Sequence, residues 1–268
     1  MAGINSLGGV NNYSWLFGAN KQKKDSISQL WSSYGNFQNN ATSALSGLTE
    51  ISANLKSVMA SYNDAKSAFQ SEFDENMSAL SEAADKLKSY NFNVEKDGAI
   101  TTTTDTDENG ITTTTTTYSK DLQAAIDTVK NFVEDYNSAI KFFGEHKDVS
   151  KRIEQMATTF GDATYRANLY DSIGLAVGSD GSLSINEAKL ADKILNDPDK
   201  VSSILGKDGL AGKAESHVSF ANSQADKLFP TAETMLGDQI STASLYTGKA
   251  YRNMSAYSNM GNLINMMF

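Results

Sequence analysis

A heptad of apolar residues near the start of the chain constrains its fold more than any other feature. From Ile27 to Phe69 the apolar positions follow alternating steps of three and four residues without a slip. A 3.5-residue repeat sustained over this length is typical of a long helix in a left-handed coiled coil. Aromatic and alanine residues in the seam favour packing between unlike helices. The predicted seam is Ile27, Leu30, Tyr34, Phe37, Ala41, Ala44, Leu48, Ile51, Leu55, Val58, Tyr62, Ala65 and Phe69.

The other end of the chain carries a matching apolar stripe. A helix is predicted near Ala214 to Leu228, and Phe229-Pro230 or the later Gly237 predicts a break or kink after it. A second helix should follow, and we expect it to pack against the N-terminal helix. Its stripe is Ile240, Ala243, Thr247, Ala250, Met254, Tyr257, Gly261, Ile264 and Phe268.

Composition excludes several classes of partner. The net charge of −9 over 268 residues argues against nucleic acid and anionic membranes, which attract clustered Lys and Arg. The chain has no cysteine, so disulfides, thiolate nucleophiles and cysteine-based zinc sites are excluded. No apolar run approaches the ~20 residues of a membrane span. The first 24 residues lack the features of a signal peptide, so we expect a cytoplasmic protein or one exported by another route.

The region between the terminal stripes mixes helices with a threonine-rich hairpin. A helix is predicted around Met77–Tyr90. The threonine runs 101–104 and 112–117 predict two strands joined by a type I′ turn at Asn109-Gly110. With so few apolar side chains, this hairpin should project into solvent or lie along a helix. Further helices are expected from Leu122 to Phe143, with Ile126, Val129, Val133, Tyr136 and Ile140 on one face, and from Val149 to Ala167.

Residues 168–212 read as a short strand, a tight turn and two capped helices. Ile173–Val177 is the predicted strand, and Asp180-Gly181 favours a turn with positive φ. Ser184 with Glu187 forms a candidate capping box for a helix with Leu190 and Ile194 on one face. Asp197-Pro198 signals the start of the next helix, and Gly206 signals its end. The apolar side of that helix is Val201, Ile204 and Leu205.

This order of motifs, "IG…DGSLSI-x-EAKL…DPDKV…L…GLAG", resembles the C-terminal half of the flagellar filament cap family, hook-associated protein 2. The segment Phe132-Val-Glu-Asp-Tyr136-Asn137 is similar to a recurring "FV-x-x-YN" in that family. The apolar end, Gly261–Phe268, is similar to the tail of many members. The resemblance covers roughly residues 122–268.

The resemblance implies an exported structural subunit that assembles with copies of itself at the filament tip. Its partners would be itself, flagellin or other hook-associated proteins, and an export chaperone. The chain departs from the family in two respects. Only residues 92–120 stand where the family has large central β-rich domains, and the opening lacks a close match to the family's "GLD"-like segment. The resemblance therefore implies a short form, in which the helical scaffold is expected more firmly than capping itself.

The sequence shows no catalytic or metal constellation. Asp105, Asp107 and Asn109 match the first half of an EF-hand loop, but Thr116 occupies the position of the bidentate acid, so a hairpin turn is the expected role. His146 and His217 are far apart and lie at no metal-binding spacing. No nucleophile elbow or phosphate-binding glycine loop is present. We predict no enzyme activity, cofactor or metal.

The candidate functional residues are those that would mediate assembly. The terminal apolar cluster around Leu263 and Met266 has two equally supported interpretations. It is either the last turn of a packed helix or an exposed apolar end that becomes ordered in an assembly. Residues 1–24 are expected to be flexible in the free monomer. The candidate interface residues are Ile27, Leu30, Tyr34, Phe37, Ile240, Met254, Tyr257, Ile264, Met267 and Phe268.

These observations predict a mainly α protein, α+β in strict terms, with long terminal coiled-coil-type helices and a compact helical middle. The expected function is a self-assembling structural subunit of the bacterial flagellum, located outside the cell. The alternative is a flagellin-like or type III-secreted helical structural protein without capping activity. The expected divisions are a flexible segment at 1–24, coiled-coil helices at 25–90, the hairpin at 91–120, a mixed middle at 121–212 and C-terminal helices at 213–268.

Overall fold

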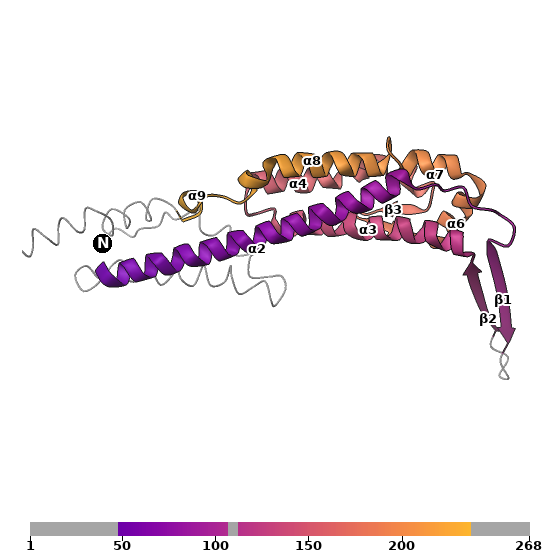
Figure 1. The fold of residues 1–268 in the computed structure, drawn as a ribbon, viewed down its shortest axis with the longest axis horizontal. Helices are drawn as coiled ribbons and strands as arrows, with labels where there is room; N and C mark the ends of the chain where they lie inside the picture. Colours follow the sequence, from indigo (N-terminus) through magenta and orange to yellow (C-terminus); the bar gives the residue numbers. More distant parts are fainter. Residues whose placement is uncertain (1–47, 107–111, 237–268) are drawn as a thin grey trace, which may run out of the picture. The chain divides into compact units, whose positions relative to one another are not determined.

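The computed structural model describes residues 48–106 and 112–236 of the chain (Figure 1). The fold is mainly α, with two small antiparallel strand pairs. The chain divides into two compact units, Met1–Ser71 with Lys227–Phe268, and Glu72–Asp226. No helix within the described ranges has the length and apolar character needed to cross a bilayer.

Helix α2 (Leu48–Ser89) carries the part of the predicted N-terminal stripe that runs from Leu48 to Phe69, and the earlier positions lie outside the described residues. Val58, Tyr62, Ala65 and Phe69 are all buried, which confirms the periodicity over this part of the seam. The helix predicted around Met77–Tyr90 is the C-terminal part of α2, which runs without a break from Leu48 to Ser89. No Gly or Pro interrupts residues 70–76, and the buried stripe continues with Phe73, Met77, Leu80, Ala84 and Leu87.

In the described part of the first unit, aromatic residues from the two parts of the chain contact each other. Helix α8 (Leu210–Leu228) ends before Phe229-Pro230, where a break was predicted, and a short helix α9 (Ala232–Leu236) follows. The ring of Phe229 lies 5.8 Å from Tyr62 and 5.4 Å from Phe69, centroid to centroid. The Tyr62 hydroxyl donates to the Pro230 carbonyl at 2.8 Å. The break after α8 therefore seats this segment against α2.

The core of the second unit lies among α3, α4, α8 and the latter half of α2. Helix α3 (Lys120–His146) buries the predicted face, including Ile126, Val129 and Tyr136. Helix α4 (Lys151–Phe160) ends at Gly161, and a 3-10 segment, η2 (Gly161–Arg166), and the short α5 (Ala167–Asp171) follow. The single helix predicted over 149–167 is therefore split. The Gly161 backbone N–H bonds back to the carbonyls of α4 and closes that helix.

Strands β3 (Leu175–Val177) and β4 (Leu183–Ile185) form an antiparallel pair that precedes two short helices. Helix α6 (Glu187–Asn196) buries Leu190 and Ile194, and α7 (Pro198–Leu205) buries Val201, Ile204 and Leu205, as predicted. The predicted capping box at Ser184 is wrong, because Ser184 lies within β4 and pairs with Ala176. Asn186 caps α6 instead, accepting from the Lys189 backbone N–H at 3.0 Å. Pairing with β3 extends the strand and delays the start of the helix.

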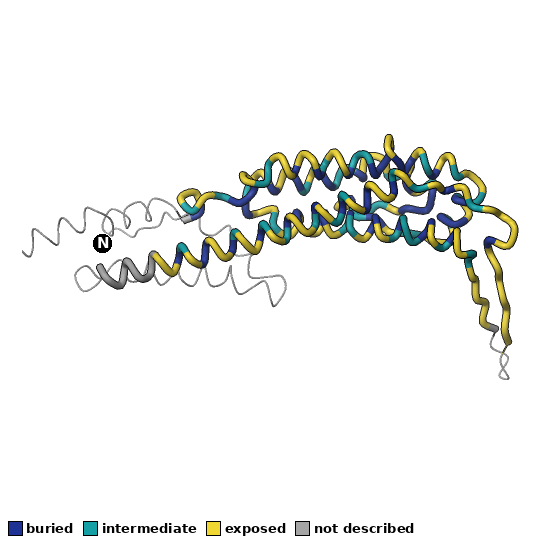
Figure 2. The backbone as a smooth tube through the Cα atoms, viewed as in Figure 1, coloured by how far each residue is buried: buried dark blue, intermediate teal, exposed yellow. Residues whose placement is uncertain are grey.

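Strands β1 (Ile100–Thr106) and β2 (Thr112–Tyr118) form an antiparallel hairpin, which is fully exposed along β1 (Figure 2). The register pairs Thr106 with Thr112, whereas a regular two-residue turn at Asn109-Gly110 would pair Thr106 with Thr113. This register departs by one residue from that of a regular two-residue turn, and the predicted type I′ turn at Asn109-Gly110 itself lies outside the described residues. The connecting residues 107–111 lie outside the described residues.

Candidate assembly site and its structural frame

The ten candidate interface residues lie outside the described parts of the chain. The structure therefore describes the frame formed by residues 48–106 and 112–236, and the ten candidates keep the status of predictions. That frame contains the residues of the "FV-x-x-YN" segment and of the 168–212 motifs, and each has a definable structural role.

The "FV-x-x-YN" segment lies on the buried face of α3. Phe132 is fully buried and its ring stacks on Tyr136, with centroids 5.8 Å apart and planes at 23°. The Tyr136 hydroxyl donates to the carbonyl of Phe160 at 2.7 Å, at the end of α4. Burial raises the pKa of Tyr136, and the nearby charge of Asp162 raises it further. Tyr136 therefore stays neutral at physiological pH and joins α3 to α4 as a hydrogen-bond donor.

Asn137 fixes the β3–β4 pair to α3. Its side-chain amide donates to the Leu183 carbonyl at 2.8 Å, and its side-chain oxygen accepts from the Leu183 backbone N–H at 2.7 Å. This two-bond geometry reproduces what a neighbouring strand would offer to β4. Because Leu183 is 4% exposed, loss of the amide would leave its backbone groups without these partners.

The turn between β3 and β4 packs against the start of η2 through two glycines. Gly181 has a φ of +89°, which confirms the predicted positive φ. A Cβ at Gly181 would collide with the Gly161 backbone, and a Cβ at Gly161 would lie 2.8 Å from the Asp180 carbonyl oxygen. The absence of side chains at both positions therefore permits the two backbones to touch.

The start of α7 follows the sequence prediction. The Asp197 side chain accepts from the Lys200 backbone N–H at 3.3 Å, and Pro198 takes the first helical position. Gly206 caps the C-terminus, and its N–H bonds to the Ser202 carbonyl. Helix α6 is linked to α3 by an ion pair of 2.8 Å between Glu187 and Lys130.

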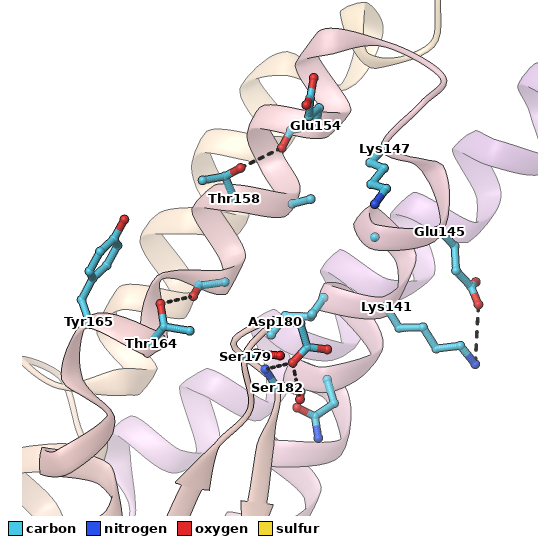
Figure 3. Close-up of a pocket in the computed structure, with 15 residues that line it drawn as sticks. Lys141, Glu145, Lys147, Glu154, Thr158, Thr164, Tyr165, Ser179, Asp180 and Ser182 are labelled. Carbon is cyan, nitrogen blue, oxygen red and sulfur yellow. Dashed lines mark hydrogen bonds and ion pairs between the residues drawn. The ribbon is translucent and has the colours of Figure 1, made fainter. Parts of the chain in front are cut away.

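A cleft of about 840 Å³ opens between α3, α4, η2 and the β3–β4 turn (Figure 3). Asp180 at its edge accepts from the Ser182 hydroxyl at 2.6 Å and from the Ser182 backbone N–H at 3.0 Å. These bonds lower the pKa of Asp180, so its carboxylate stabilises the turn and is poorly suited to act as a base near neutral pH. Lys141 faces Glu145 at 3.9 Å on the same helix. Asp180, Ser182, Lys141 and Glu145 thus serve local bonds, and they form no nucleophile–base pair in this cleft.

The two histidines occupy structural positions. The His146 ring nitrogen Nδ1 lies 2.8 Å from the Phe142 carbonyl, one turn back on α3. His217 on α8 is half-buried against the Phe160 ring, and its Nε2 lies 3.7 Å from Asp162. The Lys213 ammonium donates a hydrogen bond to the same Asp162 carboxylate at 2.7 Å. Burial lowers the pKa of His217, Asp162 opposes the shift and Lys213 adds to it. Within the described ranges, no three His, Asp or Glu side chains gather as a metal site.

Comparison with known proteins finds a family match for the C-terminal half of the chain. Residues 147–262 match the family described as "Flagellar hook-associated protein 2 C-terminus". This part of the chain is similar to the C-terminal region of hook-associated protein 2, a family of the bacterial flagellum. The match begins just before α4 and includes α5, the β3–β4 pair and α6–α9. No curated protein and no solved structure matches the chain.

The family of hook-associated protein 2 comprises structural filament-cap proteins of the flagellum, so the resemblance stated from the sequence is confirmed. Sequence reasoning found the motifs but missed what two residues do. Apolar spacing predicts only that Tyr136 lies on a buried helix face, and it assigns no role to Asn137. The polar tip of a tyrosine on a buried face, followed directly by Asn, was the available signal, because buried polar groups need partners.

Proposed function

We propose that this chain is a structural, self-assembling subunit of the bacterial flagellum that caps the filament and promotes flagellin polymerisation at its tip. The family match over residues 147–262 carries the proposal. The described frame supports it, because its polar side chains are engaged in holding α3, α4 and β4 together. Such a frame is suited to binding and positioning partners, and we infer no enzyme activity.

Copies of the chain, flagellin or other hook-associated proteins, and an export chaperone are the proposed partners. The protein would act outside the cell after export without a cleaved signal peptide. Assembly would use the two terminal stripes, since their apolar residues repeat at coiled-coil spacing. The proposed interface comprises Ile27, Leu30, Tyr34, Phe37, Ile240, Met254, Tyr257, Ile264, Met267 and Phe268.

Immunogold electron microscopy of intact flagellated cells tests the proposed location. Label at filament tips is expected, and a strain that lacks the gene serves as the control. Label along the filament would contradict capping and indicate a flagellin-like subunit. Label elsewhere on the cell would contradict any role at the filament.

Substitution of the apolar tail tests the proposed interface. Replacement of Leu263, Ile264, Met266, Met267 and Phe268 by Ser should leave the monomer folded and abolish its oligomer in sedimentation velocity. The matched control replaces Asn262 and Asn265 in the same tail by Ser and should retain the oligomer. Loss of helicity by circular dichroism in the first variant would instead make the tail part of the monomer core.

A further inference from the structure

Strand β2 presents an unusually unguarded sheet edge. Thr113–Thr117 are exposed, and β2 carries no charged residue, Gly or Pro. Edge strands in monomeric proteins are usually protected from pairing by Lys, Pro, bulges or a covering element. The other strand, β1, carries the carboxylate of Asp105. Since the hairpin sheet contains only β1 and β2 in the described structure, each strand has one outer edge.

The direction of the backbone groups of β2 follows from the hairpin register. The Ser119 N–H donates to the Ala99 carbonyl at 2.8 Å, directly beyond the pair Ile100 and Tyr118. Because hydrogen-bonded and non-bonded pairs alternate in antiparallel strands, the backbone groups of Thr115 and Thr117 point toward β1. Those of Thr114, Thr116 and Tyr118 point away from β1, along the outer edge of β2.

We propose that β2 pairs with β2 of a second copy, antiparallel and centred on Thr115, to form a four-stranded sheet. This pairing places Thr114 opposite the partner's Thr116, and Thr112 opposite the partner's Tyr118. Each outward backbone group then meets an outward group of the partner strand, and threonines form cross-strand pairs.

Charge favours this edge as the contact between copies. With a net charge of −9, two copies repel each other, and the neutral β2 allows them to approach without carboxylates opposed across the two strands. An isolated two-stranded hairpin is marginally stable, and a second copy supplies backbone partners that no other described strand gives to the outer edge of β2. This contact goes beyond the proposed flagellar role, which uses the terminal stripes.

A single cysteine in this cysteine-free chain tests the contact. At the centre of the pairing the two copies of residue 115 form a non-hydrogen-bonded pair, with Cα atoms about 4.5 Å apart. This separation lies within the range that a disulfide spans. Full-length T115C should therefore form a covalent dimer under mild oxidation. T103C is the matched control, because Thr103 is exposed on β1 directly opposite Thr115, and it should form no covalent dimer. Equal dimer yields, or dimers only in T103C, would overturn the proposal.

Charge substitutions test the register of the pairing. Adding T114K and T116K to T115C sets like charges opposite each other across the contact and should abolish the cross-link. Adding T114K and T116E sets opposite charges there and should retain it. Within each chain these residues face Thr104 and Thr102, so neither change opposes charges inside the hairpin. Identical cross-linking of the two variants would contradict the register.

A further variant shows whether the hairpin survives the charge changes. Cysteines at 103 and 115 in one chain lie on paired residues and should form an intrachain disulfide in both charge backgrounds. With the hairpin thus shown to be intact, loss of the intermolecular T115C cross-link in both backgrounds would also overturn the proposal. If the β2 pairing fails while the terminal-tail variants still change the oligomer, the flagellar proposal stands without it.

Discussion

The helical core of residues 72–226 and the β1–β2 hairpin in the same unit are stabilised by different interactions. The core is held by fully buried aromatic and aliphatic side chains, whereas every residue of β1 is exposed. The hairpin owes its shape to strand propensity and backbone pairing, and the core to removal of apolar surface from water. The stability of the unit should therefore depend far more on the core than on the hairpin. The hairpin remains available for contacts with other molecules.

The largest expected effect comes from removing an aromatic ring from the core. Phe143 is fully buried and its ring lies 4.7 Å from Phe160 and 5.2 Å from Phe142. Phe143→Ala should lower the free energy of unfolding by about 3–5 kcal/mol, because a cavity adds to the lost burial. Thr103→Ala in the hairpin should change it by less than about 0.5 kcal/mol. Urea unfolding measures both, and equal effects would refute the contrast.

The close approach of two backbones should make Gly181 more sensitive than a glycine with similar φ but open surroundings. Gly181→Ala should lower the free energy of unfolding by about 1–2 kcal/mol, because alanine disfavours the left-handed conformation. The collision of its Cβ with the Gly161 backbone should lower it further. Gly98→Ala is the control, because Gly98 has a φ of +72° and nothing within 4 Å of its added Cβ. In thermal unfolding, the melting temperature of Gly181→Ala should be well below that of Gly98→Ala. Equal melting temperatures would show that the β3–β4 turn can move away.

Loss of the Asn137 amide should destabilise the unit without creating a large cavity. Asn137→Ala removes both bonds to Leu183 and should lower the free energy of unfolding by about 1–3 kcal/mol. The exposed Asn131 on the same helix gives the control, and Asn131→Ala should change stability by less than about 0.5 kcal/mol. Indistinguishable denaturation midpoints for the two variants would argue against the anchoring role.

The smallest effect is expected from the titration of His217. Burial lowers the pKa of His217 in the folded state, so the unfolded chain binds this proton more readily. Stability is therefore lost as pH falls through the unfolded value of about 6.5. His217→Gln cannot take up this proton and should lose less stability than the parent between pH 7.5 and 5.5. Melting temperatures at both pH values test this, and parallel shifts would show that another group dominates.

Local sequence rules accounted for much of the fold. The buried faces of α2 and α3 follow from apolar spacing, because a regular helix returns to the same side every three or four residues. The Asp197 cap and the positive φ of Gly181 follow from interactions within a few residues. The resemblance in residues 168–212 also identified the family, since those motifs occur in a fixed order along the chain. Such features are determined by neighbours in the sequence.

The tertiary structure decided what depends on distant partners. Tyr136 bonds a residue 24 positions away, and Asn137 bonds one 46 positions away, so spacing alone could not assign their roles. The start of α6 at Asn186 depends on β4 first pairing with β3. The hairpin register is likewise a property of two paired strands. The sequence thus determined where helices and turns form, while long-range hydrogen bonding and pairing decided where they end and what joins them.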